Sequence, residues 1–282
     1  PLSDRIAFQV HESTIISTAA HAKIKIPHSN MKILAIHAHP DDCEILAGGT
    51  LALLAQAGHQ LTLCTMTPGD CGSAEMAADE IASVRRLEAA TGAMMIGAEY
   101  HCAEFRDLAI FNDDPSRRRV TQLLRQLAPE IIITANTPDY HCDHEATHLL
   151  VRDACFGISA PNYAPGEYRA LEAIPHLYMM DSTAGIDRDG NPLPPDFYVE
   201  VSETIEVKAM LVGCHASQRN WLRRQHGMDD YVEMSIRWTK ARGAESGLAH
   251  AEGFRQYRGH PYPQSPVLQD LLNDLTTVLN SK

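Results

Sequence analysis

The stretch MKILAIHAHPDDCEILAGGT, residues 31–50, decides the fold of this chain. Its first part, Met31–His39, is a short apolar run of strand length, rich in Ile, Leu and Ala. From Glu44 to Ala57 apolar residues recur at helical spacing, and Gly58 then supplies a stop signal. The sequence therefore predicts a buried strand that leads, through a few polar residues, directly into a helix.

The same alternation continues through the first half of the chain. Two further buried strands are predicted at Leu61–Met66 and Glu130–Asn136. Predicted helices lie at Ala77–Thr91, Ser116–Leu127 and His144–Phe156. Strands that alternate with helices are typical of a doubly wound α/β fold, so we expect a mostly parallel sheet covered by helices on both faces.

The second half of the chain is less regular. His176–Asp181 and Phe197–Val201 have the composition of strands, Thr204–Arg223 is predicted as one long helix, and residues 266–282 hold another amphipathic helix. We find no repeat or linker, and treat this half as a C-terminal elaboration of one domain. The predicted parts are an N-terminal arm (1–30), the main domain (31–260) and a C-terminal helix (261–282).

Composition excludes several classes of protein. The 282 residues carry a net charge of −12, which argues against a binder of nucleic acid or of anionic membranes, since both need a basic face. No apolar run approaches the length of a membrane span. The seven cysteines form no CxxC pair, so we expect free thiols and a cytoplasmic protein. The unusual number is 15 histidines, the commonest metal ligands and acid/base groups.

Clusters of ligand-type residues follow two of the strongest predicted strands. HPDDCE, residues 39–44, comes directly after the first strand, and DYHCDH, residues 139–144, follows the strand at Glu130–Asn136. In an open α/β sheet, ligands bind outside the carboxyl ends of the strands. We therefore expect both clusters to meet at one edge of the sheet.

The residue types in these clusters suit metal-assisted hydrolysis of an amide or ester. His39 and Asp42 could chelate one cation across a tight turn, and a third ligand from the second cluster would leave one position open, as in catalytic zinc sites. Asp41 is then the carboxylate available as general base. His141 or His144 could steady an oxyanion or protonate a leaving amine.

Two segments also resemble a known family. AHPDDCEILAGGT (38–50) and DYHCDHEAT (139–147) are similar to the HPDD and HPDH signatures of the PIG-L/LmbE-like family of zinc-dependent N-acetylglucosaminyl deacetylases. Weaker similarities are the GDCGS loop, the Arg85/Glu88 pair, HASQ and AEGF, at residues 69–73, 85–88, 215–218 and 251–254. The resemblance spans Met31–Phe254 in the expected order.

The resemblance implies a Rossmann-like fold and a metal centre. By it, His39, Asp42 and His144 would hold one Zn²⁺ per chain, although such a site accepts other divalent transition metals, and Asp41 would be the general base.

It also implies roles for three more residues. His141 would stabilise the oxyanion or act on the leaving amine, Asp143 would orient a histidine, and Arg85 would lie near the sugar. The implied substrate is a small amino-sugar from which acetyl is removed, or another sugar conjugate whose amide is cleaved. Family members commonly form trimers or hexamers, so we expect a homo-oligomer.

Several residues near the motifs have two interpretations. Cys142 replaces the proline of the second signature, while Cys43 and Cys71 lie in or near the presumed site, and we interpret all three as small packing residues rather than ligands. We also interpret His37 as a packing residue. His148, one helical turn beyond His144, could line the site or only pack.

The segment 215–258 is basic in an acidic protein, with eight Lys and Arg residues against five acids. It could recognise an anionic group of the substrate, or form a helix surface paired with the acidic body. A nucleotide-binding module is the alternative from another class, but the chain has no GxGxxG motif.

Overall fold

The described residues, 30–227 and 230–278 of this computed structural model, contain eight strands that form one sheet. The strands are β1 (Lys32–His37), β2 (Gln60–Thr65), β3 (Glu99–Cys102), β4 (Ile131–Thr134), β5 (His176–Met180), β6 (Phe197–Glu200), β7 (Ala251–Gln256) and β8 (Thr276–Val278). Their order across the sheet is β3-β2-β1-β4-β5-β7-β6-β8. The predicted N-terminal arm lies outside the described residues, except for Asn30.

The helices of the same ranges cover this sheet. They are α1 (Asp42–Gln56), α2 (Ala78–Met95), α3 (Asp114–Leu127), α4 (Cys142–Gly157), α5 (Ile205–Gly213), α6 (Ala216–His226), α7 (Tyr231–Ser246) and α8 (Val267–Leu272). No helix among the described residues is long and apolar enough to cross a bilayer.

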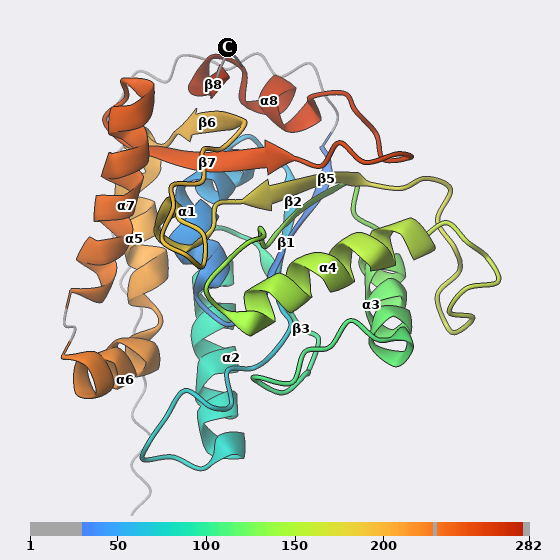
Figure 1. Ribbon diagram of the computed structural model, residues 1–282, viewed down its shortest axis with the longest axis horizontal. Helices are drawn as coiled ribbons and strands as arrows, with labels where there is room; N and C mark the ends of the chain where they lie inside the picture. Colours follow the sequence, from blue (N-terminus) through green and yellow to red (C-terminus); the bar gives the residue numbers. More distant parts are fainter. Residues whose placement is uncertain (1–29, 228–229, 279–282) are drawn as a thin grey trace, which may run out of the picture.

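The predicted α/β fold is confirmed in the first half of the chain. Strands β1 to β5 pair in parallel, with β1 between β2 and β4 (Figure 1). The strands and helices predicted there are all present. The short edge strand β3 was not predicted, because its four residues are only half-buried or exposed and form no apolar run.

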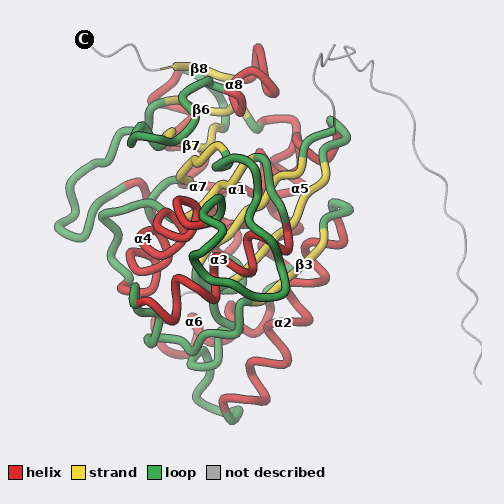
Figure 2. The backbone as a smooth tube through the Cα atoms, turned by 90° about the vertical axis from the view of Figure 1, so that its right-hand side faces the viewer, coloured by secondary structure: helices red, strands yellow, loops and turns green. Residues whose placement is uncertain are grey.

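Two layers of helices enclose the parallel strands (Figure 2). Helices α1, α2 and α5 cover one face, and α3 and α4 pack together on the other. Alternate residues of β1 serve the two sides: Ile33 and Ala35 belong to the core that includes α1, and Leu34 and Ile36 to the core that includes α4. A strand buried on both faces explains the continuous apolar run in the sequence.

The second half adds antiparallel strands to the sheet. β7 pairs antiparallel with β5 and β6, and β8 pairs antiparallel with β6. Helix α7 and strand β7 were not predicted. The predicted C-terminal helix is only partly present: residues 261–278 hold the short α8, a 3-10 turn at Asn273–Leu275 and then β8, and α8 ends where Asn273 adopts a positive φ of 45°. Residues 279–282 lie outside the described part.

The prediction of one helix at Thr204–Arg223 is also wrong. The chain breaks between α5 and α6 at Cys214 and His215, where His215 has non-helical backbone angles. Its ring is fully buried and lies 3.2 Å from Glu44 Oε1. A buried polar ring needs this partner, and reaching it interrupts the helix.

A buried ion pair ties the second half to helix α1. Glu252 of β7 accepts hydrogen bonds from the backbone of Gly49 at 2.9 Å and Thr50 at 2.8 Å, and from Lys208 Nζ of α5 at 2.7 Å. At Gly49 a Cβ atom would lie 2.6 Å from Val201. The glycine therefore lets α1 approach closely enough for Glu252 to reach its backbone.

Candidate metal centre and active site

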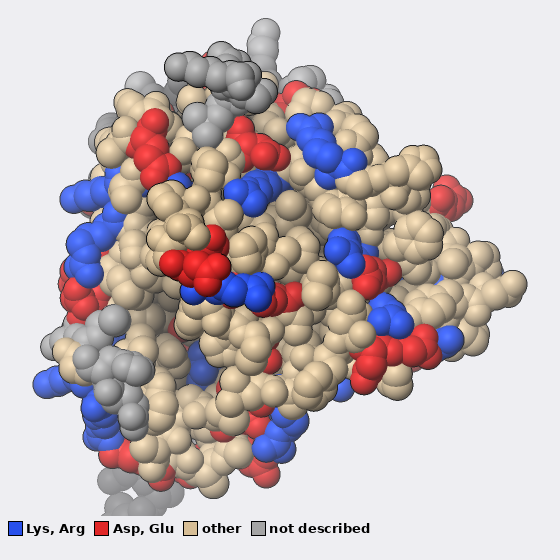
Figure 3. Space-filling model, in the orientation of Figure 1, with Lys and Arg blue, Asp and Glu red and all other residues tan. Residues whose placement is uncertain are grey.

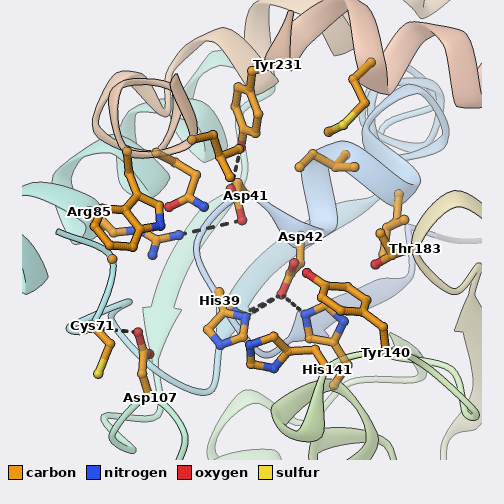
Figure 4. A pocket seen from close by; sticks show the side chains of 18 of the residues that line it. His39, Asp41, Asp42, Cys71, Arg85, Asp107, Tyr140, His141, Thr183 and Tyr231 are labelled. Carbon is orange, nitrogen blue, oxygen red and sulfur yellow. Dashed lines mark hydrogen bonds and ion pairs between the residues drawn. The ribbon is translucent and has the colours of Figure 1, made fainter. Parts of the chain in front are cut away.

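The two ligand-type clusters meet at the switch point of the sheet. β1 and β4 are parallel neighbours, and the helices that follow them, α1 and α4, leave toward opposite faces. A crevice forms at the carboxyl ends of strands at such a point. Figure 4 shows His39 and Asp42 from the first cluster close to His141 from the second.

Two of the predicted ligands, His39 and His144, approach a carboxylate oxygen of the third, Asp42. Asp42 Oδ2 lies 3.3 Å from His39 Nδ1 and 3.4 Å from His144 Nε2. Donor atoms that share a tetrahedral zinc ion at bonds of about 2.0–2.2 Å lie about 3.4 Å apart. The side-chain groups at this site whose donor atoms all lie within 4.8 Å of one another include His39 with His141 and His144, and His37 with Asp42 and His144. A metal bound by His39, Asp42 and His144 together therefore stays a prediction.

A second ring of contacts orients these ligands. His144 Nδ1 lies 2.9 Å from Asp139 Oδ1, which leaves Nε2 directed to Asp42. His39 Nε2 lies 3.2 Å from Asp143 Oδ2, so Asp143 contacts a histidine as expected. Carboxylates in such positions fix the ring orientation of metal-binding histidines. Asp139 belongs to the second cluster, but this role in orienting His144 was not predicted.

His37 is buried and hydrogen-bonded, as expected of a packing residue, but its partner, Asp42, was not predicted. Its Nδ1 lies 2.7 Å from Asp42 Oδ2, and its ring packs edge-on against that of His144 with centroids 4.6 Å apart. Within the strand, the side chain of His37 points to the opposite face from that of Ala38. Helix α1 begins at Asp42 and brings the Asp42 carboxylate to the side on which His37 lies. The contact depends on this return, which the sequence pattern does not show.

The electrostatics of the cluster favour a cation. Burial lowers the pKa of His39, but hydrogen bonds to Asp143 and Asp42 outweigh this and raise it to about 10. Burial raises the pKa of Asp42, yet the charges of His37 and His144 hold it well below its usual range. Carboxylates that favour a proton on a buried histidine would also favour a metal ion in the place of that proton.

Asp41 is set apart from the ligands in an unusual backbone conformation. It precedes α1 with φ of 102°, a left-handed conformation that is rare for residues other than glycine. Its carboxylate accepts a hydrogen bond from the Tyr231 hydroxyl and lies 3.7 Å from Arg85 Nη2. Burial raises the pKa of Asp41 against the opposing charge of Arg85. A buried carboxylate with a raised pKa suits a general base.

Tyr231 is a site residue that sequence reasoning missed. It begins α7 and is fully buried, with its ring above Asp41 in Figure 4. Burial and the neighbouring Asp41 raise the pKa of Tyr231 well above the usual range, so its hydroxyl stays protonated and donates a hydrogen bond to Asp41. No local motif marks this tyrosine, because it lies 190 residues from its partner.

His141 closes the other side of the cluster. Its ring stacks on His144 with centroids 4.9 Å apart, and its Nδ1 accepts a hydrogen bond from the backbone N–H of Asp143 at 3.1 Å. Burial and the charges of His39 and His144 lower its pKa. The ring is therefore neutral near neutral pH, with its proton on Nε2.

Arg85 lines the cleft, but its contacts are with the first motif. Nη2 donates to the carbonyl oxygen of Pro40 at 2.7 Å. The GDCGS loop wraps the guanidinium so closely that a Cβ at Gly69, where φ is +77°, would lie 2.4 Å from Nη1. These contacts hold the loop before Asp41 in place; the predicted role near the sugar remains a prediction.

The three cysteines near the site differ from one another. Cys43, in the first turn of α1, is buried in the core, as expected of a packing residue, and burial raises its pKa. Cys71 and Cys142 are exposed, so their interpretation as packing residues is wrong. His148 Nδ1–H donates a hydrogen bond to the carbonyl oxygen of Ala135, 2.9 Å away, and the side chain does not line the cleft described below.

The cluster forms the floor of a cleft of about 400 Å³. One wall comes from α6 and α7, which contribute uncharged side chains only: Gln218, Trp221, Leu222, Tyr231, Met234 and Trp238. The basic residues of the segment 215–258 do not line this cleft. In Figure 3 basic side chains lie along the outer edge of the molecule over α6 and α7, and the ion pairs Arg224–Glu75 and Arg237–Asp230 account for two of them.

Fold and site together define an α/β protein with a candidate metal centre at the switch point of its sheet. Residues 34–155, which include both ligand clusters, match the family PIG-L, described as GlcNAc-PI de-N-acetylase. This stretch of the chain is similar to that family.

Similar proteins of known name include enzymes of two kinds. A diacetylchitobiose deacetylase from Thermococcus kodakarensis is 29% identical over 208 residues, which cover 70% of this chain and 73% of the relative. A 4-oxalmesaconate hydratase from Pseudomonas putida is 24% identical over 195 residues, covering 66% and 74%. The structure of a diacetylchitobiose deacetylase from Pyrococcus horikoshii, 22% identical, shares the fold with a TM-score of 0.69 over 84% of this chain and 88% of that one.

Proposed function

We propose that this chain is a metal-dependent N-deacetylase that hydrolyses the acetamide of a small N-acetylglucosamine-type substrate. One observation carries the proposal: His39 and His144 both approach Asp42 Oδ2, at 3.3 and 3.4 Å, beside a second buried carboxylate, Asp41, which bonds to Tyr231 instead. The similarity to the deacetylase from Thermococcus kodakarensis supports the choice of substrate class.

The donor set fits a divalent transition metal, and we propose Zn²⁺, one per chain. Two imidazole nitrogens and one carboxylate oxygen are the ligands of many catalytic zinc sites. Such an ion polarises the amide carbonyl and lowers the pKa of a bound water. Asp139 and Asp143, which hold the outer nitrogens of the two histidines, keep the inner nitrogens available for it.

Asp41 takes the proton of the attacking water in this proposal. The Tyr231 hydroxyl and Arg85 hold its carboxylate in the cleft, and burial raises its pKa. After water adds to the carbonyl carbon and the C–N bond breaks, the protonated Asp41 returns its proton to the leaving amine. The products are acetate and a free amino sugar.

His141 stabilises the oxygen that gains charge as water adds. Its neutral ring, with Nδ1 occupied by the Asp143 N–H, presents an Nε2–H donor on the side of the cleft opposite Arg85 (Figure 4). Donors aimed at a developing oxyanion are among the largest contributions to catalysis of acyl transfer.

We further propose that the protein acts in the cytoplasm as a homo-oligomer, a trimer or hexamer. The free thiols of its seven cysteines agree with a reducing compartment. Light scattering after gel filtration tests the assembly, and a monomer at micromolar concentration would contradict it.

The same assay should also test two other activities. The alternative amidase of this family would release a different acid from a sugar conjugate, and the hydratase similarity points to addition of water across a carbon–carbon double bond. We favour deacetylation because the deacetylase from Thermococcus kodakarensis is more similar in sequence, at 29% identity, than the hydratase, at 24%.

The deciding experiment measures acetate released from a panel of N-acetylglucosaminides by protein stripped of metal and then loaded with Zn²⁺, Fe²⁺ or Co²⁺. We expect acetate release that depends on added metal. Turnover of conjugates without acetate release would favour the amidase, and loss of absorbance from an unsaturated acid alone would favour a hydratase.

Metal content tests the ligand set directly. His144→Ala should lose both the bound metal and activity, measured by elemental analysis and acetate release. The matched control is His148→Ala, one turn along the same helix, which should retain both because the His148 ring bonds to the Ala135 carbonyl oxygen and does not line the cleft. Equal metal content in the two variants would exclude His144 as a ligand.

A further inference from the structure

Two loops at the carboxyl ends of β2 and β3 are joined to each other beside the candidate metal centre. The strands are parallel neighbours, and their pairing continues into the loops, where the Phe105 N–H donates to the Met66 carbonyl oxygen at 2.8 Å. The first loop contains the GDCGS segment, residues 69–73, and the second contains residues 103–110. The GDCGS segment therefore follows the strand next to β1, which leads into the first ligand cluster.

Two aspartates join the loops by accepting hydrogen bonds from the backbone of the other loop. Asp70 Oδ1 accepts from the Asp107 N–H at 2.8 Å, and Asp107 Oδ2 accepts from the Cys71 N–H at 2.9 Å. Figure 4 shows the second of these contacts on the His39 side of the cleft. Loop amides need acceptors as much as helical ones do, and Asp70 is 6% exposed, so water cannot readily replace its carboxylate.

The next residue of the second loop connects this junction to the metal centre. The Leu108 N–H donates to Asp143 Oδ2 at 2.7 Å, and the same oxygen lies 3.2 Å from His39 Nε2. Asp143 is almost fully buried, so its carboxylate depends on donors from the protein. The consecutive amides of Asp107 and Leu108 thus bind two carboxylates from different parts of the chain.

Leu108 takes this position in an unfavourable backbone conformation. Its φ is +61°, in the left-handed region that residues other than glycine rarely occupy, and its side chain is exposed. An exposed side chain gains little from packing, so we attribute the conformation to the hydrogen bonds of the backbone. Such a conformation persists only where the surrounding contacts over-determine it.

We propose that Asp70 is a positioning residue of the metal centre. Asp70 fixes the loop whose Leu108 amide holds Asp143, and Asp143 in turn fixes the ring of His39. Asp70 does not line the cleft, so it acts through these residues and not on a substrate. Contacts that orient metal ligands in this way change metal affinity by about 10–100-fold when they are removed. The proposal rests on the proposed metal ligand His39, and not on which bond the enzyme cleaves.

The two oxygens of the Asp70 carboxylate can be distinguished by experiment. Oδ2 lies 2.6 Å from Arg106 Nε, but the Arg106 side chain is 67% exposed, and exposed ion pairs contribute little. Oδ1, which accepts from the loop amide, is therefore the oxygen on which the metal centre depends. Asp70→Asn keeps this acceptor and loses the charge, whereas Asp70→Ala loses both.

Metal affinity tests this role without turnover. Zn²⁺ binding to metal-stripped protein is measured by competition with a chromophoric chelator, after circular dichroism has shown that each variant is folded. We expect the Kd for Zn²⁺ to rise about tenfold in Asp70→Ala, whereas Asp70→Asn should keep most of the affinity. Arg106→Ala, which removes only the exposed pair, is the matched control and should bind Zn²⁺ as the wild type does.

An unchanged Kd in folded Asp70→Ala, or an equal rise in Arg106→Ala, would overturn the proposal. If Asp70→Ala does not fold, Asp70→Ser takes its place, because a hydroxyl keeps the position polar but is too short to replace Oδ1.

A double variant tests whether Asp70 acts through Asp143. Asp143→Ala should itself weaken Zn²⁺ binding, and adding Asp70→Ala should weaken it no further, because the contact that Asp70 supports is already lost. Additive effects would show that Asp70 stabilises the fold in general, and would refute the route through Leu108.

This inference and the proposed function fail separately. Acetate release by a protein whose Zn²⁺ affinity is the same with and without Asp70→Ala would contradict only the role of Asp70. Zn²⁺ affinity that depends on Asp70, in a protein that releases no acetate from any substrate, would contradict the deacetylase and leave the positioning role standing. Wild-type protein that binds no Zn²⁺ would contradict both.

Discussion

The two halves of the sheet contribute to the site in different ways. The parallel half, β1 to β5, supplies the candidate ligands and base from two short continuous segments at the ends of β1 and β4. The antiparallel half supplies single residues far apart in sequence, such as Tyr231 on α7 and Glu252 on β7. The candidate reactive groups of this protein thus come from short continuous segments, whereas the residues that hold them in place come from positions far away in the sequence.

The physical reason lies in the geometry of each half. At the switch point of a parallel sheet, every side chain that follows a strand is close to the crevice, so a short motif suffices. The residues of α6 and α7 lie at the site only because packing between elements far apart in sequence brings these helices over the cleft. Variants on both sides can break or sharpen this distinction.

The largest effect is expected at Asp41, in the parallel half. Asp41→Asn keeps the shape and the ligand set but removes the proton acceptor, so acetate release should fall about a thousandfold while metal content stays unchanged. Activity assays and elemental analysis on the same preparation measure both. Activity within a few-fold of the wild type would rule out Asp41 as the base. It would also contradict the view that the reactive groups all come from the two short motifs.

The next effect is on stability and comes from the antiparallel half. Glu252→Gln leaves the Lys208 ammonium buried without a counter-charge, and breaking a buried pair in this way costs about 3–5 kcal/mol of unfolding free energy. Denaturant unfolding measures the loss. The control is Glu245→Gln, whose carboxylate is half exposed and pairs with Arg242, where we expect a loss under about 1 kcal/mol.

Equal losses in these two glutamate variants would mean that the buried pair does not anchor α1. Lys208→Met combined with Glu252→Gln should recover part of the stability, because it removes the unpaired charge.

The smallest effect is expected at Tyr231. Tyr231→Phe removes one hydrogen bond to Asp41, so kcat should fall about tenfold while KM and metal content change little. Steady-state kinetics separate the two constants. In the matched control Tyr100→Phe, the hydroxyl lost is bonded to Thr65 outside the cleft, at 2.8 Å. Equal changes in kcat for both variants would show that Tyr231 is structural only.

Predictions from the sequence were correct for elements with a clear apolar periodicity and for the polar clusters that follow strand ends. The alternation of strands and helices up to Phe156 predicted the parallel half, and the clusters at 39–44 and 139–144 do meet. The predictions failed where a contact depends on the return of the chain: His37 contacts Asp42 only because α1 begins where it does. The break before α6 likewise depends on Glu44 receiving the ring of His215.

By itself, the sequence determined which residue types stand at the switch point, because polar residues after buried strands have a single edge of the sheet to occupy. Only the tertiary structure decided which atoms face one another: the histidine nitrogens turned to Asp42 by Asp139 and Asp143, the hydroxyl of Tyr231 on Asp41, and the tryptophan wall across the cleft. These contacts arise from packing between distant elements, which periodicity and spacing along the chain do not record.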